Sequence, residues 1–390
     1  MERVYYNEKY LLKVEKGNPW IHRGELMEPL DHIEPGSLVE VFTSKGDFVG
    51  SGYINPNVPI AIRLFTRSPD EKIGEDFFRK RIEQANELRM RIYPQLNAYR
   101  VVYGESDGLP GFIIDRYGDI LVLSLTTAGA ERWRPVIIKL VSEIFGPRAI
   151  VLRNDTRLRL KEGLPLEKVV IEGELPEDIV IQQHGLSYFV DVMEGRKTGF
   201  FFDQRENRGM LARFIKGDTV LDCYTYTGAW ALTAAANGAS QVWGVDNDVG
   251  AVRLAQRNAS LNGMGNCVFI AMDMDQYIEQ AAKTTRRFGC IVIDPPAFIK
   301  TRRKLPQGLE GYLRRNAEAM KLVEQGGLFV TSSCSSYLSW DGFLSMIQKA
   351  SLMARRTIRI LTQGSQAPDH PIVPALKRTG YLKCLFLRLD

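Results

Sequence analysis

Two residues combine a reactive side chain with a setting that suits chemistry, and they are Asp294 and Cys334. Cys334 follows the apolar run 327–331, a predicted strand, and lies among serines, whereas Cys290 lies inside an apolar run as structural cysteines do. A thiolate is the nucleophile that an enzyme needs when the target carbon is not itself nucleophilic. C5 of cytosine is such a carbon, because a nucleophile must first add to C6 before C5 can react.

Asp294 opens the segment Asp294–Phe298, DPPAF, directly after the predicted strand Ile291–Ile293. The two prolines remove backbone donors and fix φ, so the segment is rigid. An aspartate there that carries or shares a proton can bond to N3 of cytosine, and Phe298 can stack on the base. A D-P-P turn is as typical of a plain strand terminator. The sequence does not identify the base that removes the C5 proton.

The stretch that must position these residues begins with a predicted strand at Thr219–Cys223, a turn at Tyr224–Gly228 and an alanine-rich helix at Ala229–Asn237. This order is that of a nucleotide-binding βα unit, whose ligand lies at the carboxyl end of the strand. The dinucleotide pattern G-x-G-x-x-G is absent, and Asp222 would repel a phosphate. A nucleoside cofactor with a positive charge and no phosphate fits, and S-adenosylmethionine is such a cofactor.

Strands and helices continue to alternate, which predicts a doubly wound α/β sheet of seven strands, with 357–361 and 381–387 completing it. Asp246 ends the next strand, where a carboxylate accepts bonds from ribose hydroxyls. Asp273 and Met274 end the third, where they suit the amino group and the face of an adenine. The cofactor residues predicted from these strand ends are Asp222, Tyr224, Gly228, Asp246, Asn247, Asp273, Met274 and Asp294.

The segment 195–208, GRKTGFFFDQRENR, mixes three phenylalanines with polar residues. In one interpretation its polar side chains line the cofactor site, which adds Thr198, Gln204 and Arg205 to the predicted contacts. In the other, its aromatic side chains simply pack where two domains join.

A basic run over 300–315 follows Phe298 and carries six basic residues against Glu310. Such a run is usually a solvated face, but this one leaves the predicted catalytic strand end directly. Contacts to phosphates there would position RNA without reading its sequence. The predicted substrate-binding residues are Phe298, Lys300, Arg302, Arg303 and Lys304.

The N-terminal half has the pattern of two smaller domains. Short strands over residues 1–72 predict a small β barrel, and residues 73–190 predict an α+β domain. In the latter, a helix over 76–91 should bury one apolar face and expose one basic face. The buried residues expected are Phe78, Ile82, Ala85 and Leu88, and the exposed ones are Arg79, Lys80, Arg81, Arg89 and Arg91.

The composition is that of an ordinary globular protein, and 390 residues suggest two or three domains. The net charge of +5 is a mild indication of nucleic acid. No apolar run is long enough for a membrane span and no signal peptide is recognisable, so a cytoplasmic protein is expected. Five cysteines without a C-x-x-C pair and four histidines predict no metal site. A homodimer is left open.

These segments together resemble the 23S ribosomal RNA cytosine-5 methyltransferases of class I. The matching motifs are GNPWIHRGEL, ESDGLPGFIIDRYGD, GRKTGFFFDQRENR, LDCYTYTG, DPPAF, SSCSS and QAPDHPI. The resemblance implies a PUA domain (1–72), an α+β central domain (73–190) and a Rossmann-like methyltransferase domain (191–390). It also implies that Cys334 is the nucleophile, that Asp294 binds the base, and that ribosomal RNA is the partner.

Two features limit what the resemblance supplies. Other RNA cytosine-5 methyltransferases carry a second cysteine as P-C after the fourth strand, where this chain has Pro295-Pro296, so product release cannot use such a thiol. The family motif Asp369-His370-Pro371 has no evident chemical role. Two rival functions stay open: an amino-methyltransferase that uses DPPAF without a covalent nucleophile, and a non-catalytic RNA-binding protein with a cofactor fold.

Overall fold

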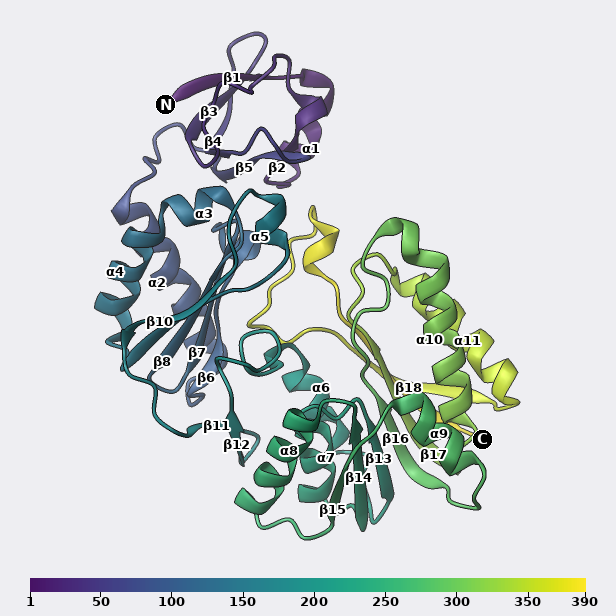
Figure 1. The fold of residues 1–390 in the computed structure, drawn as a ribbon. Helices are drawn as coiled ribbons and strands as arrows, with labels where there is room; N and C mark the ends of the chain where they lie inside the picture. The colour runs from purple at the N-terminus through teal and green to yellow at the C-terminus, as the bar shows by residue number, and fades with distance from the viewer. The chain divides into compact units, whose positions relative to one another are not determined.

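The computed structural model describes residues 1–390, and the chain folds as two compact units (Figure 1). The first unit comprises Met1–Ile181, Asp191–Phe202 and Pro368–Thr379, and the second comprises Gln182–Val190, Asp203–Ala367 and Gly380–Asp390. Each unit is therefore assembled from segments that are distant in the sequence. The predicted boundaries near residues 72 and 190 remain predictions.

The N-terminal part of the first unit is a five-stranded sheet in the order β1-β3-β4-β5-β2. Its elements are β1 (Glu2–Tyr6), α1 (Leu11–Glu15), β2 (Trp20–His22), β3 (Leu38–Thr43), β4 (Phe48–Ile54) and β5 (Ile60–Thr66). β3 and β4 form the expected antiparallel hairpin, and every second residue of β3 is buried. The short strands β1 and β2 are not evident in the sequence.

The remainder of the first unit is built on a second five-stranded sheet, in the order β10-β9-β8-β7-β6. Its strands are β6 (Ala98–Tyr103), β7 (Phe112–Tyr117), β8 (Ile120–Leu125), β9 (Ala149–Asn154) and β10 (Glu167–Gly173). Its helices are α2 (Glu75–Ile92), α3 (Ala128–Arg132), α4 (Arg134–Phe145) and α5 (Leu158–Lys161). An aromatic cluster that includes Phe77, Phe78 and Phe112 packs α2 against this sheet.

The helix α2 buries a different face from the one expected at its C-terminal end. Leu88 is exposed and Arg89 is completely buried, so the predicted burial of Leu88 and the predicted exposure of Arg89 are both wrong. The guanidinium of Arg89 donates two bonds to the carboxylate of Asp107, at 2.6 and 2.8 Å, and one to the carbonyl of Asp369 at 3.0 Å. Both residues 88 and 89 fit the helical period, and the distant carboxylate decides between them.

The same contacts give the Asp369-His370 motif a structural explanation. The Asp369 carboxylate accepts a bond from the backbone N–H of Arg100 at 3.2 Å, and it contacts Nδ1 of His370 at 2.8 Å. Both Asp369 and His370 are buried, and the imidazole ring lies 5.1 Å from that of Tyr103. These groups fasten Pro368–Thr379 to the β6 region of the first unit.

The second unit contains a seven-stranded sheet in the order β15-β14-β13-β16-β17-β19-β18. Its strands are β13 (Thr219–Cys223), β14 (Gln241–Asp246), β15 (Cys267–Ala271), β16 (Phe288–Ile293), β17 (Val323–Ser333), β18 (Ile358–Gly364) and β19 (Lys383–Leu389). Neighbours from β15 to β17 are parallel, and β19 lies antiparallel between β17 and β18. The predicted doubly wound sheet of seven strands is confirmed.

Helices cover both faces of this sheet. They are α6 (Arg205–Leu211), α7 (Ala229–Ala236), α8 (Val249–Leu261), α9 (Met274–Ala282), α10 (Leu305–Met320) and α11 (Trp340–Ala354), with β11 (Ile179–Gln183) and β12 (Leu186–Val190) forming a separate hairpin. Figure 1 shows α7 and α8 on one side and α9, α10 and α11 on the other, and side chains of these last three share one core with the sheet. No helix is long and apolar enough to cross a membrane.

The order of the strands determines where reactive side chains gather. Because the first five strands are parallel, their carboxyl ends meet at one edge, and the strand order reverses at β13 between β14 and β16. Asp222 is the second-last residue of β13 and Asp246 is the last of β14, while Asp294 and Cys334 directly follow β16 and β17. The fold therefore brings the predicted cofactor and catalytic residues to the same edge.

Candidate active site

Asp222 is a buried carboxylate that has one oxygen without a protein partner. Its Oδ2 accepts bonds from the Thr225 hydroxyl at 2.6 Å and the Ala231 N–H at 3.0 Å, whereas Oδ1 has no donor. Burial, with the nearby charges of Asp294 and Asp246, raises the pKa of Asp222 to about 7. A buried acceptor without a donor is costly, and a cationic or hydrogen-bonding ligand at this strand end would satisfy it.

The turn after β13 holds three residues in left-handed conformations. The φ angles of Tyr224, Tyr226 and Gly228 are 65°, 49° and 86°, and such values are uncommon for side chains other than glycine. Strained turns of this kind cluster at ligand sites. A side chain at Gly228 would meet the Phe269 ring at 3.1 Å, so close packing explains this glycine. Cofactor contacts from Tyr224 and Gly228 stay predictions.

The carboxylate of Asp246 is oriented by the backbone. Its Oδ2 accepts the N–H of Tyr226 at 3.0 Å, and its Oδ1 accepts the N–H of Asp248 at 3.0 Å. These bonds fix the side chain, which is buried, across the turn that follows the neighbouring strand β13. A carboxylate oriented in this way can accept hydrogen bonds from ribose hydroxyls.

The other residues predicted near the ribose and adenine have mixed settings. Asp273 is exposed and caps α9 by accepting the N–H groups of Asp275 and Gln276 at 2.9 and 3.3 Å. Met274 is buried in the core between the sheet and its helices, and Asn247 is exposed. Capping and core packing therefore account for Asp273 and Met274, and their cofactor roles are untested predictions.

Asp294 lies at the centre of a small polar network. Its Oδ1 accepts a bond from Gln204 Nε2 at 2.9 Å, and its Oδ2 accepts one from Trp230 Nε1 at 3.0 Å. Gln204 also donates to the Ser332 hydroxyl at 3.2 Å and accepts from Asn207 at 2.6 Å. Burial raises the pKa of Asp294, which favours the protonated form that could share a proton with a base.

Trp230 is a residue of this site that the sequence does not single out. It lies in α7, and its indole N–H fixes the orientation of Asp294. The signal that could have found it is one tryptophan in an alanine-rich helix, directly after the cofactor turn. The sequence also predicts Gln204 as a cofactor contact, whereas the structure shows Gln204 bonded to Asp294.

Cys334 differs from the three fully buried thiols, which are Cys223, Cys290 and Cys384. Its side chain is half-buried, and its Sγ contacts the carbonyl oxygen of Pro295, next to Asp294, at 3.9 Å. Burial raises the pKa of Cys223 and Cys290 well above the ordinary thiol value, and that of Cys267 to about 11. The thiol that the sequence selects is therefore partly accessible, as Cys267 also is, and it lies beside the Asp294 segment.

The segment 195–208 is divided between the units after Phe202. In the first unit, the Thr198 hydroxyl contacts Asp115 at 2.5 Å and Tyr117 at 2.9 Å, while Phe200 and Phe202 are buried. In the second unit, Arg205 begins α6 and is buried. The Phe202 ring packs against those of Tyr117 and Phe200 within the first unit. Packing of the aromatic residues at a domain join, and cofactor contacts by Thr198 and Arg205, remain predictions.

The basic run has two parts with different surroundings. Arg314 and Arg315 pair with Asp275 at 2.7 and 2.8 Å, so they belong to the fold. The earlier basic residues, Lys300, Arg302, Arg303 and Lys304, are exposed and have no ion pair. The Phe298 ring is half-buried, 4.6 Å from the Tyr312 ring and 4.8 Å from the Arg315 guanidinium.

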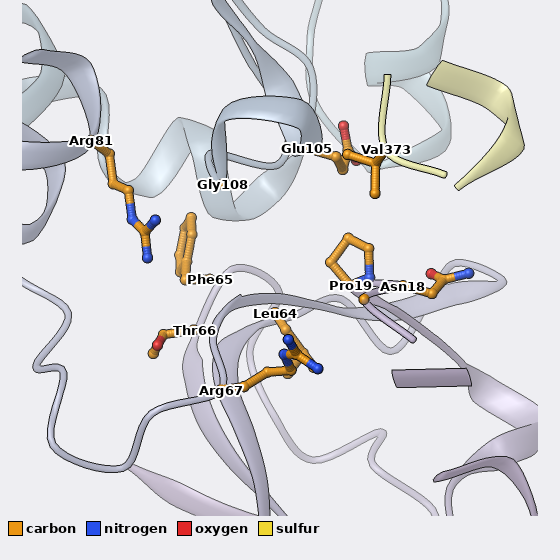
Figure 2. Close-up of a pocket in the computed structure, with 11 residues that line it drawn as sticks. Asn18, Pro19, Leu64, Phe65, Thr66, Arg67, Arg81, Glu105, Gly108 and Val373 are labelled. Atoms are coloured by element: carbon orange, nitrogen blue, oxygen red, sulfur yellow. The ribbon is translucent and has the colours of Figure 1, made fainter. Parts of the chain in front are cut away.

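A pocket of about 370 Å³ lies in the first unit, as Figure 2 shows. Arg67 follows β5 and donates to the carbonyls of Val14 and Glu15, both at 3.0 Å, while Arg81 from α2 pairs with Glu71 at 3.0 Å. The lining residues are Gly17, Asn18, Pro19, Leu64, Phe65, Thr66, Arg67, Arg81, Glu105, Gly108 and Val373. Its charged lining residues are Arg67, Arg81 and Glu105, and its remaining lining residues are neutral.

Residues 159–370 match the family described as S-adenosylmethionine-dependent methyltransferase, and residues 7–67 match that described as PUA-like domain. The fold and the two family matches thus define a methyltransferase with a Rossmann-like domain, an N-terminal PUA-like domain and S-adenosylmethionine as its cofactor.

Curated relatives extend over nearly the whole chain. The ribosomal RNA large subunit methyltransferase I of Shewanella denitrificans is 36% identical over 386 residues, covering 96% of each chain. The protein of the same name from Cronobacter sakazakii is 34% identical over 381 residues, again covering 96% of each. The chain belongs to this family of methyltransferases.

Solved structures agree on the fold. A methyltransferase complexed with SAH superimposes with a TM-score of 0.87 at 21% identity, and a second structure, from Streptococcus mutans, with a TM-score of 0.85 at 21% identity. Both comparisons cover 100% of each chain. This likeness confirms the Rossmann-like methyltransferase fold that the sequence predicts.

Proposed function

We propose that the protein transfers a methyl group from S-adenosylmethionine to C5 of a cytosine in large-subunit (23S) ribosomal RNA, through a covalent bond between Cys334 and C6. The observation that carries the proposal is the contact of Cys334 Sγ with the Pro295 carbonyl, beside the half-buried carboxyl of Asp294, whose pKa is raised. The substrate class is taken from the names of relatives that match along nearly the whole chain. Action on ribosomal RNA also supports the expected cytoplasmic location.

The residues at the strand ends fit the cofactor. The buried, unpartnered Oδ1 of Asp222 suits a cationic group, and the oriented carboxylate of Asp246 suits ribose hydroxyls. When bound, the cofactor supplies an electrophilic methyl group on a sulfonium. Asp222, buried close to Asp246 and Asp294, adds negative potential at this edge of the sheet.

The chain's own residues carry the other steps. The Cys334 thiolate adds to C6, which forms the S–C6 bond and makes C5 nucleophilic. Asp294, whose pKa is raised by burial, holds a proton at N3 and so offsets the negative charge that develops on the ring. Once C5 carries the methyl group, loss of the C5 proton restores the double bond and expels the cysteine as a thiolate.

The exposed basic residues after Phe298 are placed to contact RNA phosphates. Arg302, Arg303 and Lys304 have no carboxylate partner, so their charges are available. Neutralising all three should weaken RNA binding and reduce its salt dependence by about three phosphate contacts or fewer. Arg67, at the first-unit pocket, offers a second test by the same titration. An unchanged salt dependence in the triple variant would contradict this docking role.

The decisive experiment replaces Cys334 with alanine. We expect Cys334→Ala to lose methylation by about a thousandfold or more while cofactor binding and unfolding stay close to wild type. RNA with 5-fluorocytosine at the target should trap a covalent complex with the wild type, because fluorine cannot leave as a proton does. Sequencing that detects 5-methylcytosine in ribosomal RNA gives the position.

The matched control is Cys290→Ala, which removes a buried thiol from the neighbouring strand β16. This variant should lose some stability and keep its chemistry. An adduct that forms equally well with Cys334→Ala would refute the covalent role. Full activity of Cys334→Ala would instead support transfer to an exocyclic amino group.

A further inference from the structure

Lys383 is a buried lysine beside the predicted nucleophile. It begins β19, where its Cα lies opposite that of Ser333, the residue before Cys334. Its side chain is only 2% exposed, and its Nζ donates to the carbonyls of Ser335 at 3.1 Å and Tyr381 at 2.7 Å. The ammonium is thus held by two carbonyls that flank the Cys334 loop and the start of β19.

No carboxylate pairs with Lys383, and this is unusual for a buried lysine. The group whose charge favours its ammonium form is Cys334. Burial, with the charge of Cys334, raises the pKa of Tyr312 in α10, whose hydroxyl contacts that of Ser335 at 3.0 Å. Asp203 accepts a bond from the Tyr381 hydroxyl at 2.5 Å. Neither of these groups provides Lys383 with an ion pair.

Two observations therefore need one explanation: a lysine is buried without an acid, and a thiol that must ionise lies beside it. Burial lowers the pKa of Lys383 to about 8, even though the neighbouring Cys334 charge favours the ammonium form. A cation next to a cysteine correspondingly lowers the thiol pKa. A lysine with a purely structural role at this point would destabilise the fold, because no ion pair compensates its burial.

We propose that Lys383 is the positioning residue that keeps Cys334 ionised, an inference that rests on the proposed covalent function. The unprotonated amine takes the proton from Sγ, so that an S–H bond breaks, an N–H bond forms, and a thiolate–ammonium pair results. The thiolate then attacks C6 and becomes a neutral thioether. When the cysteine is expelled, the ammonium stabilises the thiolate again.

The effect of the ammonium on expulsion of the cysteine is important because residues 295 and 296 are both proline. No second thiol therefore follows β16 to assist release of the methylated RNA. A fixed positive charge beside Sγ makes Cys334 a better leaving group as well as a better nucleophile. Lys383 acts through the sulfur and leaves the removal of the C5 proton to another group.

The test measures ionisation of Cys334 directly, without RNA or cofactor. The rate of alkylation by iodoacetamide at Cys334, followed by peptide mass spectrometry, is recorded from about pH 6 to pH 10. In the wild type, the midpoint should lie below the ordinary thiol pKa of about 8.5. Lys383→Met should raise that midpoint by about one pH unit or more, and Lys383→Arg should keep it low.

The matched control is Cys384→Ala, which alters the adjacent buried residue of β19 without changing charge. An unchanged midpoint in folded Lys383→Met, or an equal shift in Cys384→Ala, would overturn the proposal. If Lys383→Met fails to fold, the wild-type profile still tests the proposal. A wild-type alkylation midpoint at or above the ordinary thiol pKa would overturn the proposal as well. Folding is checked by thermal unfolding of each variant.

Methylation gives a separate readout. Lys383→Met should be slow at neutral pH and recover as the pH rises, with unchanged cofactor affinity, whereas structural damage would not be rescued by alkali. Loss that persists at every pH in a folded variant would contradict the role. If Cys334→Ala keeps methylating, the proposed function fails, and the alkylation profiles still decide whether Lys383 controls the thiol.

Discussion

The two units treat buried charge in opposite ways. In the first unit, buried arginines meet carboxylates at distances from 2.6 to 2.8 Å, in the pairs Arg89–Asp107, Arg100–Asp115 and Arg63–Glu162. At the strand ends of the second unit, Asp222 and Lys383 are buried, Asp294 is half-buried, and none of the three has an ion pair. Their pKa values are displaced as a result.

This difference separates charges that maintain the fold from charges that are held ready for a ligand. A paired buried charge is compensated within the protein, and removing one partner leaves the other uncompensated. An unpaired one weakens the fold until something else compensates it, which is why displaced pKa values cluster at functional sites. Substitutions in the two units should therefore affect different properties.

The largest effect on stability is expected from Arg89→Met in the first unit. The change leaves the Asp107 carboxylate buried without its partner, so the free energy of unfolding should fall by about 3–5 kcal/mol. Urea denaturation measures it, with Arg91→Met on the exposed face of α2 as the control. A loss no larger than that of the control would mean that the pair is not needed.

The next largest effect is expected from Asp294→Asn, and it should fall on activity. We expect the methylation rate at saturating cofactor to drop about a hundredfold, because the amide cannot hold a transferable proton at N3. The free energy of unfolding should change by no more than about 1 kcal/mol, since the amide can still accept from Trp230 or Gln204. A variant that loses stability and keeps its rate would erase the contrast between the units.

Asp246→Ala tests the cofactor side of the same edge. Loss of charged hydrogen bonds to the ribose should weaken S-adenosylmethionine binding by about 1–3 kcal/mol, measured by calorimetry. Asp273→Ala should cost less, because Asp273 is exposed and already caps α9. Equal losses in the two variants would indicate that exposure does not distinguish their roles.

The smallest effect is a pH dependence of cofactor binding that is due to Asp222. Its pKa of about 7 means that the carboxylate is mostly protonated below that pH and charged above it. Only the charged form attracts a cationic cofactor, so affinity should rise about tenfold from pH 6 to pH 8. The rise should be absent in Asp222→Asn, and a persistent rise there would assign the effect to another group.

Much of the fold of the second unit was predictable from the sequence, because the alternation of strand and helix is repeated along it. Apolar strands that end in carboxylates predict the doubly wound sheet, and the neighbouring strand ends that carry Asp294 and Cys334 are adjacent in the structure. Serines around Cys334 distinguish it from Cys290 in sequence, and the structure agrees by burying only the latter fully. Local pattern is sufficient where neighbouring elements in the chain are also neighbours in the sheet.

Prediction failed where a partner is distant along the chain. Leu88 and Arg89 both fit the helical period. The sequence does not show that the Asp107 carboxylate and the Asp369 carbonyl accept hydrogen bonds from Arg89. The sequence does not indicate Lys383, because its strand β19 pairs antiparallel with β17. Its partner there, Ser333, lies 50 residues earlier in the chain. A charged residue in an apolar strand shows that something compensates it, without showing what.

The division of the chain into interleaved segments has a consequence for how the protein can be dissected. The backbone passes between the units at residues 181/182, 190/191, 202/203, 367/368 and 379/380. Neither unit can be excised as one continuous polypeptide, because a fragment that ends before residue 368 would leave the Arg100 N–H without its Asp369 acceptor. After a single proteolytic cut, the two fragments would still be held together by the contacts within each unit. Genetic exchange of the second unit between relatives would require several coordinated junctions.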